Sequence, residues 1–244
     1  MHPATDDSLV FHAAQVDQAG HRLIGPLTLT LTERRIAVIG RNGAGKSSFL
    51  RLASGLIAPT EGRVTLGGSD PFRDRRKMLT LVGILFQNPD QQIIFPTVAE
   101  EMAFGLRQQG RDKAEARDMV RAHLARLGRA NWETRLTQSL SQGQKQWLCL
   151  QAVLLMRPRV ILLDEPFASL DLPTRMRLVR ELSALSQRLI TVTHDPAAAA
   201  GADRVIWLEE GRVAADGVAD DVLPRFHARM SELGGMDADP DPSA

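Results

Sequence analysis

The stretch GRNGAGKSS, residues 40–48, packs three glycines and a lysine directly behind the apolar run IAVI. It fits the pattern G-x-x-x-x-G-K-[S/T] through Gly40, Gly45, Lys46 and Ser47. A turn with few Cβ atoms lets successive backbone N–H groups converge on phosphate oxygens, and a helix that follows it adds the positive end of its dipole. The apolar strand, the turn and the helix together predict a phosphate-binding loop.

Each part of this loop has an expected role toward a nucleotide. The Lys46 ammonium is expected to reach the β- and γ-phosphates, and the Ser47 hydroxyl is expected to bind Mg²⁺. An ordinary glycine-rich turn is the alternative, and the position between a strand and a helix counts against it. The predicted phosphate contacts are Gly40, Arg41, Asn42, Gly43, Ala44, Gly45, Lys46, Ser47 and Ser48.

Further along the chain, apolar runs alternate with helical patterns. The runs VILLD (160–164) and LITVT (189–193) are separated by a segment whose Leu178, Leu182 and Leu185 share one helix face. Strands that alternate with helices predict a parallel sheet covered on both faces. The expected fold class is therefore α/β, with a P-loop NTPase core and a mainly parallel sheet flanked by helices.

Two regions depart from this alternation. Before the phosphate loop, LVFHA and LTLTLT alternate as antiparallel strands do, which predicts an N-terminal antiparallel β subdomain. From about 88 to 157 the pattern is helical, with Thr97 and Glu100 placed as a capping box, which predicts an inserted helical subdomain. The domain is expected to span 1–233, and the tail 234–244 is expected to be disordered because it has little to bury.

Composition limits the possible functions. The 244 residues are 43% hydrophobic and 24% charged, and their formal net charge is +1, so no overall field attracts nucleic acid or an anionic membrane. The single cysteine, Cys149, lies in an apolar helical run and is expected to be a buried thiol. No apolar run approaches the roughly 20 residues that span a bilayer, and the chain start lacks an export signal. We expect a protein that is soluble and not exported.

A second element carries carboxylates to the expected phosphate site. The buried strand ending in Asp164 places that carboxylate at the carboxyl edge of the sheet, where Mg²⁺ would lie. Glu165 follows and is expected to act as the general base that orients and deprotonates a water molecule. Two solvated acids at a strand end are the alternative. The loop upstream favours the catalytic interpretation.

These residues stand in an order that resembles the ABC-type ATPases. LSQGQ (140–144) is similar to the family's signature motif, and Gln87 in ILFQNPD is similar to the Q-loop glutamine. SLD (169–171) resembles the D-loop, and His194 in TVTHD resembles the switch histidine. The similarity extends from about Leu9 to Leu223, which is nearly the whole chain. The other five histidines are interpreted as surface residues.

The resemblance implies a head-to-tail dimer, in which ATP on one copy's phosphate loop is covered by the signature of a second copy. Ser141, Gly143 and Gln144 would then contact the partner's nucleotide, and Asp171 would help to align the opposite site. Glu165, His194 and Gln87 would be catalytic. Ser47, Asp164 and Gln87 would bind the Mg²⁺ that accompanies ATP.

The segment FQNPDQQIIFPTVAEEMAFG, residues 86–105, is more distinctive than the shared motifs. It resembles the same region of ATPases in energy-coupling factor (ECF) importers, which take up vitamins or transition-metal ions, and its variant is most similar to that of biotin importers with a single kind of ATPase. The resemblance implies a transmembrane coupling subunit, a separate substrate-binding membrane subunit, and a peripheral position on the cytoplasmic face of the inner membrane. A cobalt, nickel or other vitamin importer is one alternative. A soluble ABC ATPase acting on nucleic acid or ribosomes is another, but a nucleic-acid partner is not expected because the charge is neutral.

The chain departs from the family pattern in two places. Gln142 replaces the first glycine of the usual signature pair, and we expect the phosphate contact to survive because Ser141 and Gly143 remain. The family commonly stacks adenine on an aromatic residue, often tyrosine, and this chain has no tyrosine. Residues 16–18 lie near the equivalent position, and none of them is aromatic. Because no aromatic ring would stack on the base, weaker selectivity for adenine is expected.

Overall fold

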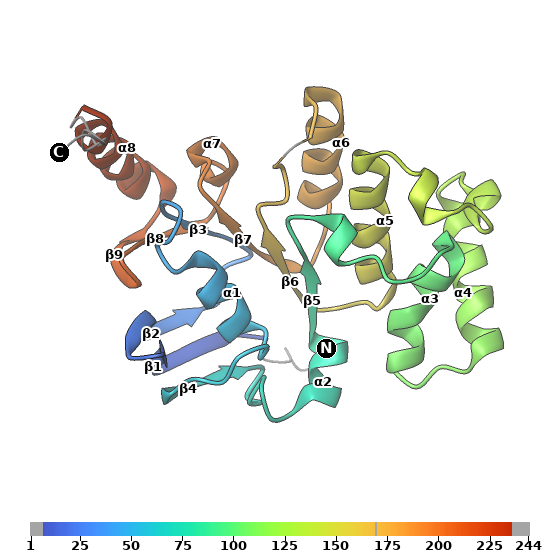
Figure 1. Cartoon of the computed structure of the whole chain (residues 1–244), viewed down its shortest axis with the longest axis horizontal. Coiled ribbons are helices and arrows are strands. Elements are labelled where there is room, and N and C mark those ends of the chain that lie inside the picture. Colours follow the sequence, from blue (N-terminus) through green and yellow to red (C-terminus); the bar gives the residue numbers. More distant parts are fainter. Residues whose placement is uncertain (1–6, 169, 236–244) are drawn as a thin grey trace, which may run out of the picture.

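The computed structural model describes residues 7–168 and 170–235. These residues form two sheets with helices between and around them (Figure 1). The smaller sheet has the order β2-β1-β4 and is antiparallel throughout. Its strands are β1 (Leu9–Gln18), β2 (His21–Leu31) and β4 (Glu61–Leu66).

The larger sheet has the order β5-β6-β7-β3-β8-β9, and all its neighbours are parallel except the pair β8 and β9. Its strands are β3 (Arg35–Ile39), β5 (Val82–Leu85), β6 (Val160–Asp164), β7 (Arg188–Thr193), β8 (Arg204–Glu209) and β9 (Arg212–Gly217). Because β6, β7 and β3 are parallel neighbours, their carboxyl ends meet at one edge of the sheet. The predicted site residues that follow these strands are thereby brought together.

Helices cover the sheets on several sides. The α-helices are α1 (Lys46–Ala53), α2 (Arg75–Leu81), α3 (Val98–Gln108), α4 (Lys113–Arg126), α5 (Gln142–Leu155), α6 (Leu172–Ser183), α7 (Pro196–Ala199) and α8 (Ala219–Gly235). Short 3-10 helices are η1 (Pro89–Gln91), η2 (Ala130–Trp132) and η3 (Thr137–Ser139). Among the described residues, no helix is both long and apolar enough to cross a membrane.

The core between the two sheets contains α1. Phe49 of α1 stacks on Phe11 of β1 with ring centroids 5.1 Å apart, and both are fully buried. Val38 of β3 joins this cluster, whereas its neighbour Ile39 packs on the other face with α7 and α8. This alternation follows from the two-residue period of a strand, so β3 is buried on both faces.

The helices between η1 and the end of α5 have a core of their own. Trp132 and Trp147 meet edge to face there with ring centroids 5.2 Å apart. Thr97 begins α3 as expected, because its side-chain oxygen accepts a hydrogen bond from the Glu100 N–H. The opposite side of α5 packs on the sheet, with Cys149 fully buried among residues of β5 and β6, and this burial raises the pKa of the thiol. The cysteine is therefore a packing residue, as expected.

The architecture confirms the expected fold class: a mixed, mainly parallel sheet between helices, with a three-stranded antiparallel sheet at the N-terminal side. Helix α8 includes Gly234 and Gly235, the first two residues of the expected tail. The rest of that tail lies outside the described residues.

Candidate nucleotide site

The predicted phosphate loop connects β3 to α1. Gly40 has no space for a side chain, because a Cβ there would lie 2.4 Å from the Leu208 carbonyl oxygen of β8. Gly45 precedes α1 with a φ of 98°, a backbone conformation that glycine adopts at little cost. The pattern of glycines is therefore explained by the neighbouring strand and by the turn. The result is an exposed turn that ends at a helix N-terminus, an arrangement suited to binding anions.

Lys46 is the cation at the centre of the loop. Its ammonium donates to the carbonyl oxygens of Gly40 at 2.8 Å and Arg41 at 3.0 Å, and the residue is only 8% exposed. Burial lowers the pKa of Lys46, and the charges of Glu165 and Asp164 oppose that shift. The lysine therefore stands within the electrostatic reach of both predicted carboxylates.

Asp164 ends β6 at the same edge of the sheet. Burial raises the pKa of Asp164, the charge of Glu165 raises it further, and Lys46 and Arg51 act in the opposite direction. A cation at this edge would relieve the repulsion between the two carboxylates.

Glu165 has an unusual backbone conformation, and both of its carboxylate oxygens contact residues at the end of β7. Its φ is 43°, which is uncommon for a residue with a side chain. Its Oε2 accepts a hydrogen bond from the Thr193 hydroxyl at 2.9 Å. Its Oε1 accepts from the His194 backbone N–H at 2.8 Å and lies 2.7 Å from His194 Nδ1. The end of β7 thus fixes a carboxylate that is 9% exposed.

Thr193 is a site residue that the sequence interpretation missed. It holds Glu165 and also accepts the Asp195 N–H at 3.0 Å, so it orders the whole turn after β7. The only signal in the sequence is its position directly before His194 at a strand end.

Oxygen donors suited to magnesium are present near the loop. Ser47 is exposed at the first turn of α1 and Asp164 is half-buried at the end of β6. Mg²⁺ prefers hard oxygen ligands and is usually bound by one or two carboxylates together with substrate phosphates. The donor set of Ser47 and Asp164 fits that preference, so these two residues would hold the ion.

Gln87 follows β5, the neighbour of β6, and its side chain is exposed. The backbone before it is fixed by Gln92, whose amide accepts from the Phe86 N–H at 3.1 Å and donates to the Ile84 carbonyl at 3.3 Å. Gln92 was also missed by the sequence interpretation. Gln87 therefore lies at the same edge of the sheet as Asp164, and its side chain is exposed to solvent.

The predicted signature residues begin α5. Ser141 caps this helix, and Gln144 completes a capping box by accepting the Ser141 backbone N–H at 3.0 Å. Gly143 faces α6, because a Cβ there would lie 2.6 Å from Thr174 Cγ2. Gln142 is exposed on the first turn. Lys145, which follows Gln144 in the helix, forms an ion pair with Asp90 of η1.

Asp171 caps α6 by accepting the Thr174 N–H at 3.0 Å, and hydrogen bonding from the Thr174 side chain and backbone holds the pKa of its carboxyl below the usual range. The signature and the described D-loop residues therefore form one group at the N-terminal ends of α5 and α6. The phosphate loop belongs to a different group. In Figure 1, α1 and α5 stand apart with β5 and β6 between them. Ser169 lies outside the described residues.

The position expected to face the adenine base offers no stacking surface. Val16 is 6% exposed and pairs with Ile24 in the antiparallel sheet. Asp17 and Gln18 are not aromatic, and Asp17 pairs with Arg22.

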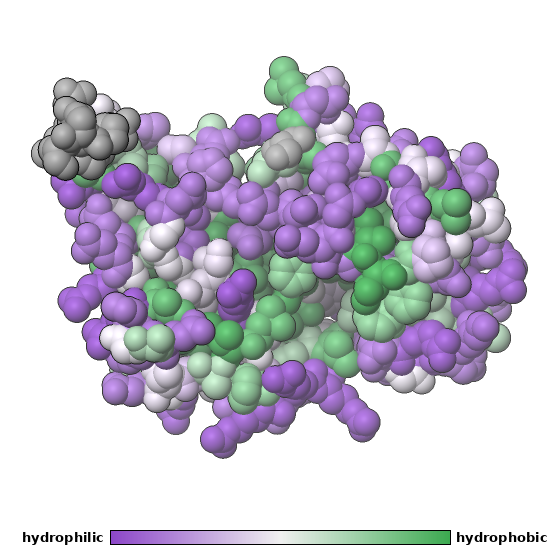
Figure 2. Space-filling view, viewed as in Figure 1, coloured by the Kyte–Doolittle hydropathy of each residue, from purple (hydrophilic) through white to green (hydrophobic). Residues whose placement is uncertain are grey.

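A groove follows the distinctive segment on the helical side. It has a volume of about 670 Å³ and is lined mainly by α3 and the residues just before it, among them Phe95, Ala103 and Phe104. Charged side chains of both signs also line it: Arg107, Lys113, Arg117, Glu100 and Glu133. Figure 2 shows hydrophobic side chains gathered on this face over the segment between η1 and α3. Ile94, in that segment, is 67% exposed.

A parallel sheet with a glycine-rich loop between β3 and α1, and a strand-end carboxylate near the loop lysine, defines a P-loop nucleotide-binding protein. A family model described as ABC transporter matches residues 25–168. The chain therefore belongs to the ABC transporter family, as its motifs predicted.

Similar proteins include transport ATPase subunits. The chain is 51% identical over 218 residues to the Biotin transport ATP-binding protein BioM of Rhodobacter capsulatus, covering 89% of this chain and 93% of that protein. It is 32% identical to the Energy-coupling factor transporter ATP-binding protein EcfA1 of Latilactobacillus sakei, covering 89% of this chain and 79% of that protein. The structure of cbiO1 from Clostridium perfringens, part of the ABC transporter complex cbiONQ, superposes with a TM-score of 0.74 at 27% identity, covering 93% of this chain and 95% of that one.

Proposed function

We propose that this chain is the ATP-binding and ATP-hydrolysing subunit of an energy-coupling factor importer, and that biotin is its cargo. The observation that carries the ATPase assignment is the meeting of Lys46, Asp164 and Glu165 at one edge of the sheet, with Glu165 fixed by Thr193 and His194. The cargo assignment is supported by the similarity to BioM and by the segment 86–105.

In this proposal the loop binds the phosphates of ATP. Lys46 exchanges its bonds to the loop carbonyls for bonds to the β- and γ-phosphate oxygens, which are stronger because both partners are charged. Mg²⁺, held by Ser47 and Asp164, would neutralise charge on the phosphates. Glu165 accepts a proton from the water whose oxygen attacks the γ-phosphorus, and ADP leaves as orthophosphate forms.

The bonds around Glu165 explain how it could serve as the base. Thr193 and His194 fix both carboxylate oxygens, so the base loses little additional freedom when the water arrives. His194 is more exposed than Glu165 and so can also face the γ-phosphate. Gln87 would approach from the end of β5.

The signature of one copy would complete the loop of a second copy. Ser141, Gly143 and Gln144 lie at the start of α5, whose N–H groups and dipole favour an anion. A γ-phosphate supplied by a partner's ATP would bind there, and ADP lacks that group. Driving such a pair from mostly open to mostly closed takes about 5.5 kcal/mol of differential binding, which two sites with charge-assisted bonds can supply.

The transmembrane coupling subunit would dock in the groove beside α3. Its apolar floor and the exposed Ile94 suit an amphipathic helix, and Arg107 and Lys113 would meet acidic side chains or lipid phosphates. Closure of the ATPase pair would then move that subunit. The chain would lie peripherally on the cytoplasmic face of the inner membrane.

The decisive experiment is to co-express the chain with candidate membrane subunits of an energy-coupling factor importer, purify the complex from membranes and identify the small molecule retained. Biotin bound to the complex, with uptake into vesicles that requires ATP, is the expected result. A different vitamin or a metal ion would overturn the cargo assignment and leave the ATPase assignment intact. A chain that remains free of every membrane subunit would overturn the importer assignment.

A further inference from the structure

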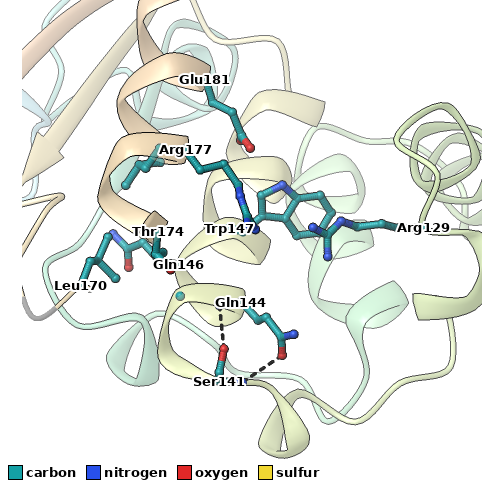
Figure 3. A pocket seen from close by; sticks show the side chains of 11 residues that line it. Arg129, Ser141, Gln144, Gln146, Trp147, Leu170, Thr174, Arg177 and Glu181 are labelled. Atoms are coloured by element: carbon teal, nitrogen blue, oxygen red, sulfur yellow. Dashed lines mark hydrogen bonds between the residues drawn. The ribbon is translucent and has the colours of Figure 1, made fainter. Parts of the chain in front are cut away.

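A cavity of about 170 Å³ lies between α5 and α6, behind the signature residues (Figure 3). Its wall includes Arg129 and Trp147 from the helical side and Arg177 and Glu181 from α6. The volume is several times the roughly 30 Å³ that one water molecule occupies in the liquid. The cavity therefore has room for a small polyatomic ligand.

The cavity contains an unpartnered donor. Gln146 is 3% exposed, lines the cavity, and its side-chain Nε2 has no hydrogen-bond partner among the described residues. A buried amide without a partner destabilises the fold, so such a group is rarely left without an acceptor. The missing partner is an oxygen that this part of the chain does not provide.

Two arginines supply positive charge at the same place. The Arg129 guanidinium lies 4.2 Å from the Trp132 ring centre and 4.3 Å from that of Trp147, and this double stacking fixes its plane. Neither Arg129 nor Arg177 has a salt bridge within residues 7–168 and 170–235. In the view of Figure 3 they approach Trp147 from opposite sides. Their charges repel, and burial together with Arg177 lowers the pKa of Arg129.

Among the described residues, Glu181 is the only carboxylate in the wall of this cavity. Burial raises the pKa of Glu181, and the charges of Arg129 and Arg177 act against that rise. It also accepts a hydrogen bond from the Gln151 amide at 3.3 Å. One carboxylate against two guanidinium groups leaves an excess of positive charge, with most guanidinium N–H donors uncommitted.

We propose that this cavity is a binding site for orthophosphate, held by the Arg129 and Arg177 guanidinium groups and the Gln146 amide. A tetrahedral oxyanion offers several acceptor oxygens, which matches donors that converge from two helices and a loop. The anion would bridge α5 and α6 and so join the helical subdomain to the core. This site is separate in its residues from the loop that binds ATP.

Orthophosphate has an evident source under the proposed function. ATP hydrolysis releases it, and the signature residues Ser141 and Gly143 line the same cavity. Phosphate released at a partner's nucleotide could therefore pass into the cavity on its way out. This source rests on the proposed function, whereas binding of the anion to the chain does not.

The test is calorimetric titration of orthophosphate into the full chain with its phosphate loop first saturated with MgADP. We expect binding, and at least about tenfold weaker binding in Arg177→Gln, since a hydrogen bond to a charged group is worth roughly 1.5–3 kcal/mol, about 10- to 150-fold. Gln146→Leu should weaken binding by about threefold or more while leaving the thermal midpoint equal or higher, because it removes the unpartnered donor. Arg180→Gln, on the same helix but outside the cavity, is the matched control and should bind orthophosphate as the parent does.

Several results would overturn the proposal. One is the absence of phosphate binding to the parent chain. Another is equal affinity in the parent, Arg177→Gln and Gln146→Leu, which would mean that the anion binds elsewhere. A titration of ADP into Lys46→Ala distinguishes a site for free orthophosphate from a site for the phosphates of a nucleotide. If ADP binding gives heat with Lys46→Ala but no heat with the double variant Lys46→Ala and Arg177→Gln, the nucleotide itself binds in the cavity. That result would overturn the choice of orthophosphate as the ligand. If instead orthophosphate binds as expected while the chain shows no ATPase activity, the proposed function fails and the anion site stands.

Discussion

Replacing Glu165 by glutamine separates its chemical role from its structural role. The carboxylate accepts bonds from the Thr193 hydroxyl and from the backbone and ring N–H groups of His194. Glutamine can keep its oxygen toward His194 and turn its NH₂ toward Thr193. The change makes the two bonds from His194 neutral, a loss of about 1 kcal/mol each, and it reverses the direction of the bond with Thr193, while relief of the buried charge offsets part of the loss. We expect a net loss of stability of about 0–2 kcal/mol, which leaves a folded protein.

The effect on catalysis should be much larger. A lost general base lowers turnover by about 10²- to 10⁴-fold, while the affinity for ATP should be unchanged because Lys46 and the loop remain. Steady-state ATPase rates, nucleotide titration and thermal unfolding measure the three quantities separately. Thr193→Val is the matched control, since it loosens the same carboxylate without removing it and should cost less activity. Near-normal hydrolysis by Glu165→Gln would refute the assignment of the base. A variant that stays monomeric at saturating MgATP in sedimentation velocity would refute the γ-phosphate as the link between copies.

Four further outcomes follow from the same geometry. Lys46→Ala should weaken MgATP binding itself by at least about tenfold, because it removes charge-assisted bonds to the phosphates; unchanged affinity in a titration would exclude that role. Gly143→Ala should impair ATPase activity by pushing on Thr174 across the 2.6 Å approach, and Thr174→Ser, which lacks the methyl group, should restore activity in the double variant; failure of that rescue would remove steric contact as the cause. Gln142→Gly should leave ATPase activity unchanged, and a marked gain would show that this side chain obstructs the phosphate contact. Because Val16 offers no aromatic face, GTP should compete with ATP within about tenfold, and a much larger preference for ATP would reveal another base contact.

The sequence predicted the fold and the glycine-rich turn between β3 and α1 because their signals are local. The glycines of 40–48, the apolar runs before Gly40 and Asp164, and the capping residue Thr97 each determine structure within a few positions of themselves. The order of parallel strands then brings Glu165 to the phosphate loop. No exact tertiary contact is needed for that inference.

What the sequence did not predict depends on packing between distant elements. The bond from Thr193 to Glu165 joins residues 28 positions apart, and nothing about a threonine in a strand distinguishes it beforehand. The close approach of Gly143 to Thr174 likewise requires α5 and α6 to be placed. One interpretation was wrong: His123, expected at the surface, is buried and lies 2.9 Å from the Gln151 amide oxygen, because α4 packs on α3 and so brings this side chain to Gln151 of α5.

The ion pair between Lys145 and Asp90 has a consequence for how transport depends on ionic strength. It ties α5, which begins at the predicted signature residues, to η1, and the Asp90 side chain is 52% exposed. A half-exposed pair contributes roughly 1 kcal/mol or less and weakens as salt rises. Under the proposed function, concentrated salt should therefore partly uncouple hydrolysis from transport. ATP hydrolysis would continue, but the amount of cargo moved per ATP would fall.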